Sequence, residues 1–441
     1  MHCILFTDIN GSLGIGKYAG TYRLATELRN SGNEVTIIDY MMSYTIKELK
    51  DIIRKHKRKN TEWVGFSSTF LAPRNFDVFL NRFQTTNKIK ETTCIGLSKV
   101  EADELFDYIK SLGLKICIGG SKVKNEFSNV ENIYGEGEIK FNKNFDFTQS
   151  KINWTTKDNI FEGEHLPIEI ARGCIFKCKF CSYNLNGKKL WEFCKSPEVV
   201  KQELMENWIK FGTTGYMFCD DTYNDSPEKV SSFNNMIKKL PFDIEFSTYA
   251  RLDLILSRPE TLPQLIESGM KSVFFGIESF NHKSGKFVGK GMHPDKIKQG
   301  LLDIKKQYPE LQISLGFIAG LPYETKETLK DSVKWLKNSP IDNWSMQVLS
   351  LGKKSILGSN PSKFGYTIDK NGKWYNDNLT YDEAIDIVNT PITSISGFTF
   401  YNRLRNLGYT PEQTSKLTID DRKEIELRTK NVIEKYKEKI I

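Results

Sequence analysis

Three cysteines lie close together directly after a short apolar run that is typical of a β-strand. They are Cys174, Cys178 and Cys181, spaced C-x3-C-x2-C in the segment IARGCIFKCKFC. This spacing indicates an iron–sulfur cluster held by thiolates. A [4Fe–4S] cube normally takes four thiolates, and no fourth cysteine lies nearby at ligand spacing. One iron is therefore expected to lack a protein ligand, and such an open iron can bind a substrate or a cofactor.

Structural zinc and buried free thiols are the alternatives for this motif. Structural zinc needs four ligands in paired Cys or Cys/His sets. The nearest histidine, His165, precedes the predicted strand, and nothing downstream completes a pair. The remaining cysteines fall in or beside apolar runs that are typical of core thiols: Cys3, Cys94, Cys117, Cys194 and Cys219. The spacing therefore favours the cluster.

The motif resembles that of the radical S-adenosylmethionine (SAM) superfamily. Members of that family chelate SAM on the open iron and have an aromatic residue before the third cysteine, as Phe180 is here. The resemblance implies a [4Fe–4S] cluster, SAM and an external one-electron reductant of the flavodoxin or ferredoxin type. It also implies reductive cleavage of SAM to methionine and a 5′-deoxyadenosyl radical, which removes hydrogen from the substrate.

A second series of strand and helix patterns, over residues 166–355, must position the motif. Two of its helices have clear start signals, Ser196-Pro197-Glu198 and Ser226-Pro227-Glu228. The predicted strands are Pro167–Ala171, Gly215–Cys219, Ile244–Ala250, Ser272–Ile277, Gln312–Ile318 and Asn343–Leu349. Six consecutive units predict a partial (β/α)6 barrel, which is the core fold of radical SAM enzymes. Its active site is expected at the carboxyl ends of the strands.

The predicted strand ends carry groups that suit SAM, which presents an amino group, a carboxylate, ribose hydroxyls and adenine. The resemblance assigns Asp220 or Asp221 to the amino group and Arg251 to the carboxylate, as a bidentate partner. It assigns Glu278 to ribose or amino groups, and Ile318 to the segment that lays apolar backbone against adenine. Singly, Arg251 and Glu278 could be surface ion pairs, which contribute little to stability.

Residues 1–140 show the alternating strand and helix patterns of a doubly wound, Rossmann-like parallel sheet. The predicted strands are Cys3–Asp8, Glu34–Asp39, Trp63–Thr69, Thr93–Leu97 and Lys115–Gly119, and the predicted helices are Tyr18–Ser31, Thr45–Lys57 and Val100–Leu112. Such sheets bind ligands at the carboxyl ends of their strands. The layout ends in YGEGE at residues 134–138 and resembles the cobalamin-binding domain that precedes many radical SAM barrels.

That second resemblance implies a bound cobalamin against small and polar residues of the strand-end loops: Asp8, Gly14, Ser67, Ser68, Gly119 and Gly120. No histidine occurs between His2 and His56, so a loop histidine cannot coordinate cobalt. An empty structural domain is the alternative. The stretch 11–17 matches the G-x4-G-K pattern of a phosphate loop, but Tyr18 follows where a nucleotide loop needs Ser or Thr.

Two further regions complete the predicted domain organisation. Residues 141–165 are polar and lack periodicity, so they are expected to be a linker. Residues 356–441 carry aromatic residues and then an amphipathic charged helix from Ile419 to about Lys439. We expect this C-terminal region to cover the open edge of the barrel, to shape the substrate pocket, or both.

The bulk composition fits a cytoplasmic enzyme. A chain of 441 residues predicts two or three domains, and its eight scattered cysteines do not form a disulfide framework. Neither a secretory leader nor a membrane span is indicated. The formal charge of +8 is a mild excess, and the dense run from Arg54 to Lys59 ends a predicted helix, so nucleic-acid contact is not expected.

Together these features predict a cobalamin-dependent radical SAM enzyme that methylates an unactivated carbon. A methylthiotransferase acting on tRNA or a ribosomal protein is one alternative. It would need three more cluster cysteines in the first domain, whereas Cys3, Cys94 and Cys117 lie in strands, and a C-terminal β-barrel, whereas the C-terminus here is helical and charged. A non-catalytic iron–sulfur or cobalamin carrier is the other alternative, and it would need no SAM pocket.

Overall fold

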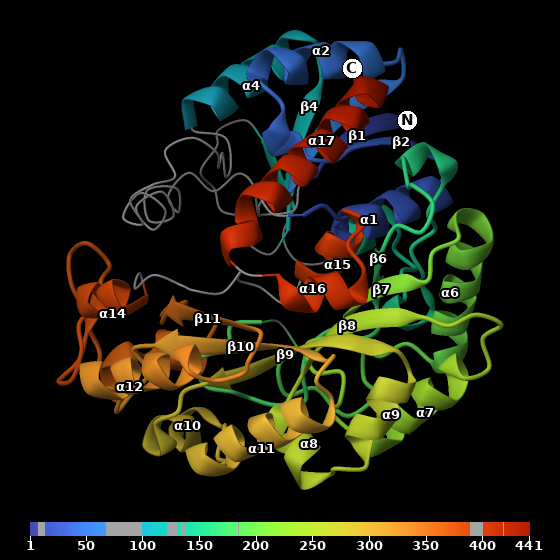
Figure 1. The fold of residues 1–441 in the computed structure, drawn as a ribbon. Helices are drawn as coiled ribbons and strands as arrows, with labels where there is room; N and C mark the ends of the chain where they lie inside the picture. Colours follow the sequence, from blue (N-terminus) through green and yellow to red (C-terminus); the bar gives the residue numbers. More distant parts are fainter. Residues whose placement is uncertain are drawn as a thin grey trace.

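Two parallel β-sheets with flanking helices make up the computed structural model of this chain. The structure describes residues 1–7, 14–67, 99–120, 130–133, 137–183, 185–388, 400–417 and 419–441. The first sheet and the second lie one above the other, with α1, α15 and α16 near the level where they meet (Figure 1). The predicted Rossmann-like domain followed by a six-stranded half-barrel is confirmed.

The first sheet has the strand order of a doubly wound fold, β2-β1-β3-β4-β5. Its strands are β1 (His2–Phe6), β2 (Glu34–Ile38), β3 (Thr61–Ser67), β4 (Lys115–Gly119) and β5 (Glu131–Ile133). Alternate side chains of β1 enter two cores: Cys3 and Leu5 face the barrel side, whereas Ile4 and Phe6 face the other side. The predicted strand Thr93–Leu97 lies outside the described residues, and β5 was not predicted.

Helices pack against both faces of this sheet. They are α1 (Ala19–Asn30), α2 (Ile46–His56), α4 (Lys99–Ser111) and the short α5 (Gly137–Phe141). Helix α2 begins with a capping box in which Thr45 and Glu48 satisfy each other's backbone N–H groups. All three helices predicted in this domain are present, with ends shifted by one residue.

The second sheet is an open half-barrel whose strands follow in chain order, all parallel. They are β6 (Leu166–Glu169), β7 (Gly215–Cys219), β8 (Glu245–Ala250), β9 (Met270–Glu278), β10 (Gln312–Ala319) and β11 (Asn343–Val348). The connecting helices are α6 (Pro197–Phe211), α7 (Pro227–Ile237), α8 (Leu252–Ser257), α9 (Thr261–Glu267), α10 (His282–Val288), α11 (Pro294–Gln307) and α12 (Lys326–Lys337). Ser196 and Ser226 cap α6 and α7, as predicted.

The C-terminal region is divided between the two sheets. Helix α14 (Tyr381–Val388) packs along the edge strand β11, which is the predicted cover of the barrel edge. Helix α15 (Phe400–Arg405) contacts β7 and β8, and α16 (Pro411–Lys416) follows it. Helix α17 (Arg422–Ile440) instead shares an apolar core with β1 of the first sheet (Figure 1). An amphipathic pattern gives the apolar stripe of a helix but not the surface that this stripe covers.

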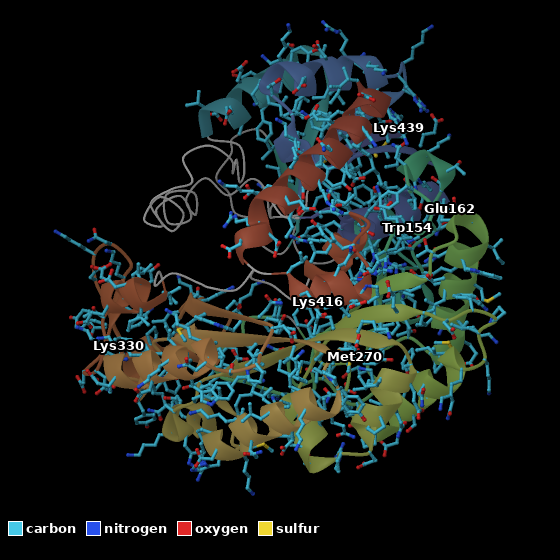
Figure 2. The ribbon with its side chains drawn as sticks, viewed as in Figure 1. Trp154, Glu162, Met270, Lys330, Lys416 and Lys439 are labelled. Atoms are coloured by element: carbon cyan, nitrogen blue, oxygen red, sulfur yellow. The ribbon has the colours of Figure 1, made fainter. Side chains whose placement is uncertain are left out.

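The predicted linker is packed rather than loose. Trp154 is buried, and its ring lies 4.3 Å from that of Tyr22 in α1. It belongs to one apolar cluster that joins Leu5 of the first sheet to Leu166 and Ile168 of the barrel, and Figure 2 shows it between the two domains. The two domains therefore share a continuous core.

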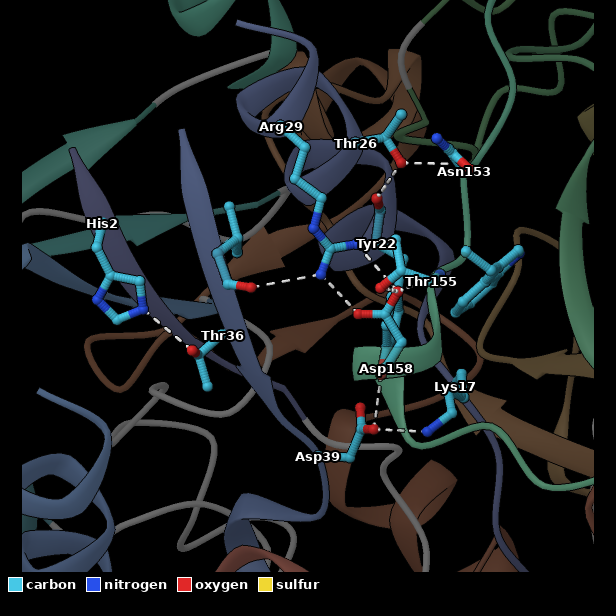
Figure 3. A network of polar contacts seen from close by, with 12 residues as sticks. His2, Lys17, Tyr22, Thr26, Arg29, Thr36, Asp39, Asn153, Thr155 and Asp158 are labelled. Carbon is cyan, nitrogen blue, oxygen red and sulfur yellow. Dashed lines mark hydrogen bonds and ion pairs between the residues drawn. The ribbon is translucent and has the colours of Figure 1, made fainter. Parts of the chain in front are cut away.

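Polar contacts reinforce this junction (Figure 3). The Arg29 Nη2 atom lies 2.6 Å from Asp158 Oδ1, which ties α1 to the linker. Asp39, which follows β2, accepts hydrogen bonds from Lys17 Nζ and Tyr22 Oη, both at 2.7 Å, and Lys17 and Asp39 are buried. The Arg29–Asp158 pair crosses the junction, whereas the Lys17–Asp39 pair lies within the first domain, and loss of one partner would leave the other charge buried and uncompensated.

No helix within the described residues is long and apolar enough to cross a membrane.

Candidate functional site

The cysteine motif lies on a loop that leaves β6 at its carboxyl end. Gly173 turns the chain with φ of +75°, and a β-carbon there would overlap Leu185. The backbone then folds tightly, because Gly187 N–H donates to Cys174 O at 2.7 Å and Cys181 N–H donates to Cys178 O at 3.0 Å. All three cysteines are half-buried, and none of them forms a disulfide. The loop therefore presents three thiols at the mouth of the barrel.

Polar groups accompany each thiol. The Cys174 Sγ and Thr222 Oγ1 atoms lie 3.1 Å apart, and Arg251 Nη1 lies 3.6 Å from Cys178 Sγ. Burial raises the pKa of Cys181, while hydrogen bonds from the Tyr183 backbone and the Asn186 side chain favour its thiolate. Donors and cations beside half-buried thiols suit anionic ligands, so this loop fits the donor set of an iron–sulfur cluster.

No group of three or more Cys, His, Asp or Glu side chains within the described ranges is spaced to hold one metal ion. In a cube each thiolate binds a different iron. A wider separation of the three thiols than in a single-ion site is compatible with that arrangement.

The two adjacent aspartates after β7 differ in their surroundings. Asp220 is buried and accepts a hydrogen bond from Lys229 Nζ at 2.6 Å. Its carboxylate is therefore neutralised by an ion pair inside the protein. Asp221 is exposed and accepts a hydrogen bond from the Gly173 backbone at the start of the cysteine loop. Of the two predicted partners for SAM, Asp221 is thus the one that faces the site.

Arg251 follows β8 and turns toward the cysteine loop. Its Nε and Nη2 atoms donate to the two carboxylate oxygens of Asp253, at 3.0 and 2.6 Å. Its guanidinium lies over the ring of Phe176, 3.9 Å from the centroid, in a cation–π contact. The fork that a bidentate SAM carboxylate would need is occupied, so the predicted role of Arg251 is not matched by this geometry.

Glu278 ends β9 with φ of +70°, a strained conformation for a residue with a side chain. Its carboxylate lies over Gly276, where a β-carbon would overlap it, and 3.6 Å from Lys290 Nζ. Burial raises the pKa of Glu278, and Lys290 counteracts part of that rise. Strain together with a buried carboxylate at a strand end is typical of a ligand-binding residue.

The loop after β10 is held from two sides. Ile318 is half-buried at the end of this strand, and Gly320 follows with φ of +100°. Glu324 accepts hydrogen bonds from the Gly320 and Leu321 N–H groups, at 2.9 and 3.1 Å. Burial raises the pKa of Glu324 to about 7. Glu324, four residues after Gly320, was not predicted as a site residue, because its role depends on the folded loop from whose N–H groups it accepts hydrogen bonds.

Phe180, next to Cys181, is half-buried against the main apolar core. The cysteine loop also touches more distant segments. Lys179 N–H donates to Val288 O at 3.2 Å, and Leu357 N–H donates to Lys179 O at 2.9 Å. The loop is therefore anchored to α10 on one side and to α13 (Ile356–Ser359) on the other.

The first-domain positions assigned to cobalamin are only partly described. Asp8 and Ser68 lie outside the described residues. Gly14 is described, but its N–H donates to Thr429 Oγ1 of α17 at 2.8 Å, and a β-carbon there would overlap Arg403. The close approach at Gly14 is therefore to the C-terminal region. The contact with Arg403 explains why a glycine is needed at position 14, and the sequence alone could not show it.

Three other predicted positions do lie at the carboxyl edge of the first sheet. Ser67 and Gly119 are the last residues of β3 and β4 and are register partners. Gly120 follows with φ of +122°, a conformation that favours glycine. Among the described residues, Ile133 is the neighbour that a β-carbon on Gly119 would meet, in ordinary contact. The described part of this edge is therefore compatible with a ligand that approaches the backbone.

The Radical SAM superfamily matches residues 168–336 of this chain. The matched segment begins in β6 and contains the three cysteines and the strand ends through β10. Residues 168–336 form a radical SAM domain.

Two curated relatives are named methyltransferases. "Uncharacterized methyltransferase PH0819" from Pyrococcus horikoshii is 31% identical over 172 residues, 39% of this chain and 36% of that protein. Bacteriochlorophyllide d C-8(2)-methyltransferase from Chlorobaculum tepidum is 25% identical over 186 residues, 40% of each chain. This chain thus matches well under half the length of these relatives, in a stretch of the size of the radical SAM domain.

The solved structure of TsrM, a radical SAM methyltransferase from Kitasatospora setae with cobalamin and a [4Fe–4S] cluster bound, has a similar fold over nearly the whole chain. The TM-score is 0.60, with 98% of this chain and 99% of that chain covered, at 13% identity. The radical SAM domain here is therefore embedded in a domain arrangement like that of TsrM.

Proposed function

We propose that this chain is a radical SAM enzyme that transfers a methyl group with the help of cobalamin. The observation that carries the proposal is the cysteine loop, which presents Cys174, Cys178 and Cys181 at the mouth of a half-barrel, each with a polar partner. The names of two relatives, both methyltransferases, support the reaction class. An unactivated carbon is the proposed acceptor, because a carbon that is neither acidic nor nucleophilic cannot take the electrophilic methyl group of SAM by polar chemistry.

The three cysteines would hold the [4Fe–4S] cluster, and SAM would bind its open iron. Asp221 and Glu278 would accept hydrogen bonds from the SAM amino group or ribose, and the backbone at Ile318 would lie against adenine. When bound, the cluster supplies the electron for SAM cleavage and cobalamin supplies a methyl carrier. The protein's own contribution is to position these groups and to exclude water from them.

Cobalamin would lie at the carboxyl edge of the first sheet, where Ser67, Gly119 and Gly120 allow close approach. The strand order of that sheet and the TsrM-like arrangement of the two domains support this placement. Because the sequence has no histidine between His2 and His56, cobalt would receive no histidine ligand from these loops.

The enzyme would work in the cytoplasm with an external one-electron reductant of the flavodoxin or ferredoxin type. No nucleic-acid or membrane partner is proposed. The mild excess of charge, +8 over 441 residues, does not point to a polyanionic substrate.

Anaerobic reconstitution with iron, sulfide and hydroxocobalamin tests the proposal. With SAM and reductant, the wild-type protein should contain about four irons and form 5′-deoxyadenosine and S-adenosylhomocysteine, measured by mass spectrometry. Cys181→Ala should lose both products and most of the iron. The matched control Cys194→Ala changes a buried thiol of the same segment and should keep them. Full iron content in a triple Cys174, Cys178, Cys181 alanine variant would refute the site.

A further inference from the structure

Arg251 is fixed in place more firmly than a ligand-binding arginine needs to be. Its side chain is only 7% exposed, and Asp253 holds it through two hydrogen bonds. Nη2 also donates to Gly289 O at 3.3 Å, and the face of the guanidinium is covered by Phe176. Both edges and one face are thereby occupied, so the side chain cannot turn without losing several contacts.

The remaining nitrogen points at the cysteine loop. Nη1 lies 3.6 Å from Cys178 Sγ, which is within the range of an N–H···S hydrogen bond. Of the five guanidinium N–H groups, three donate to Asp253 and Gly289, one to Cys178, and one on Nη1 is left. A single N–H cannot form the paired bonds that a carboxylate receives from an arginine fork.

Other groups near the thiols act differently. The Thr222 hydroxyl beside Cys174 also lies 2.7 Å from the Asp221 carbonyl, so its one proton is shared. Lys290 is close enough to favour the Cys178 thiolate electrostatically, but its ammonium donates to Gly276 O at 2.8 Å and faces Glu278. Of these groups, Arg251 is thus the cation whose N–H is directed at the Cys178 Sγ atom.

We propose that Arg251 is a positioning residue for the cluster: it donates a charge-assisted hydrogen bond to the Cys178 thiolate and raises the reduction potential of the cluster. The physical reason is that reduction adds negative charge to the cluster and its thiolates, and a nearby proton and cation stabilise that charge. Asp253 is the residue that aims the guanidinium. The inference rests on the proposed cluster, but not on cobalamin or methyl transfer.

The test is a redox titration of the reconstituted cluster without SAM and without cobalamin, followed by electron paramagnetic resonance. At a fixed potential the ratio of reduced to oxidised cluster in Arg251→Met should fall about tenfold or more, which corresponds to 59 mV for one electron. Arg251→Lys keeps the positive charge but loses the forked guanidinium. Its ratio of reduced to oxidised cluster should lie between those of the wild type and Arg251→Met. Lys290→Met removes charge without removing a bond to sulfur and should shift the ratio less than Arg251→Met.

A second measurement separates this role from SAM binding. SAM affinity of the oxidised protein should change less than about threefold in Arg251→Lys, whereas a clamp on the SAM carboxylate would cost roughly tenfold or more. An unchanged potential in both Arg251 variants would overturn the inference, and so would a normal potential with lost SAM affinity. If Arg251→Met lowers the iron content, the reduction potential is measured in Arg251→Lys and in Asp253→Asn instead. An unchanged potential in both of these variants would overturn the inference.

The exposed Arg258→Met serves as the control for loss of a distant positive charge. Absence of any cluster in the wild-type protein would instead refute the proposed function itself. The two failures are therefore distinguishable.

Discussion

Trp374 lies directly against the α-carbon of Gly320, so closely that a β-carbon at Gly320 would overlap the indole ring. Trp374 belongs to the short hairpin formed by β12 (Thr367–Ile368) and β13 (Trp374–Tyr375), and its Nε1 donates to Leu349 O at 2.8 Å. Directly before this hairpin, Tyr366 Oη donates to Gly320 O at 2.7 Å. The hairpin therefore fixes the loop that follows β10.

Gly320→Ala should weaken SAM binding at least about tenfold while the iron content stays normal. The added methyl group meets Trp374 in a backbone conformation with φ of +100°, so the loop must shift, at a cost of about 1–3 kcal/mol. Equilibrium binding of SAM to the reconstituted protein measures the effect. Gly113→Ala is the matched control, because Gly113, before β4 in the first domain, has φ of +72° with no described atom within 4 Å of an added β-carbon. Equal SAM affinity in the two variants would contradict a role for the Gly320 loop in SAM binding.

Glu278→Gln should keep the cluster and lose SAM affinity. The change removes a charged acceptor at the strand end, and one charged hydrogen bond contributes roughly 1.5–3 kcal/mol, about ten- to a hundredfold in affinity. SAM binding and 5′-deoxyadenosine formation are the measurements. Glu267→Gln, at the end of α9 beside Lys238, is the control for loss of a surface carboxylate. Wild-type affinity in Glu278→Gln would remove this residue from the pocket.

Acid should loosen the junction of the domains through Glu169, the last residue of β6. Burial alone would raise the pKa of Glu169, but the Arg23, Arg172 and Lys195 cations outweigh burial and lower the pKa to about 2. Because that value is below the ordinary 4.5, the ionised carboxylate stabilises the folded state above about pH 4.5. This contribution, on the order of 3 kcal/mol, is lost as the pH falls from 4.5 toward 2.

Urea unfolding at a series of pH values measures this loss. Glu169→Gln should be less stable than the wild type at pH 7, because Arg23 is fully buried and its Nε donates to Glu169 at 2.7 Å. The difference should shrink as the pH approaches 3. A difference independent of pH would mean that the packing of residue 169, and not its charge, matters.

Gly119→Val should abolish retention of hydroxocobalamin and leave the iron content unchanged. A β-carbon on Gly119 meets only Ile133, at 3.7 Å, so the described protein itself tolerates a side chain there. Loss of cobalamin would then come from a clash with the ligand. Absorbance of the desalted protein measures the bound corrin, and Gly352→Val, at an open position, is the control. Full retention would move the cofactor away from this edge.

Gly14→Ala should detach α17 from the first sheet. The methyl group would overlap Arg403 at a position with φ of +80°, and the hydrogen bond from Gly14 N–H to Thr429 would be strained. We expect a loss of stability larger by about 1–3 kcal/mol than in Gly32→Ala, which has φ of +77° and no neighbour within reach. Urea unfolding gives the difference, and limited proteolysis in α17 gives its location. Equal losses would show strain without detachment.

Periodicity and capping signals were sufficient for most of the fold. The apolar runs 115–119 and 215–219 gave the bounds of β4 and β7, because each is a buried strand between polar turns. Such local signals could not separate Asp220 from Asp221. The two are identical neighbours, and only the position of Lys229 determines that the first is buried in an ion pair.

The site was harder to predict wherever a partner decides the role of a residue. Arg251 was assigned to SAM by resemblance, but Asp253, two residues further on, takes its fork. Gly14 was assigned to cobalamin as a small residue, yet the neighbour that requires it is Arg403. A glycine in the sequence indicates that another group comes close to the backbone, and an arginine indicates a positive charge. Which residue or ligand contacts them is known only from the folded structure.

The hydrogen bond between Gly14 and Thr429 spans 415 positions in the sequence, and the one between Asp39 and Tyr436 spans 397. During synthesis, the first sheet therefore emerges from the ribosome long before α17 exists to cover it. Ile4 and Phe6 share their core with α2 and α4 as well as α17, so the part that α17 supplies is added only after the whole barrel has been translated. At about 5–20 residues per second this is an interval of roughly half a minute. The domain whose strands are made first thus completes its core last.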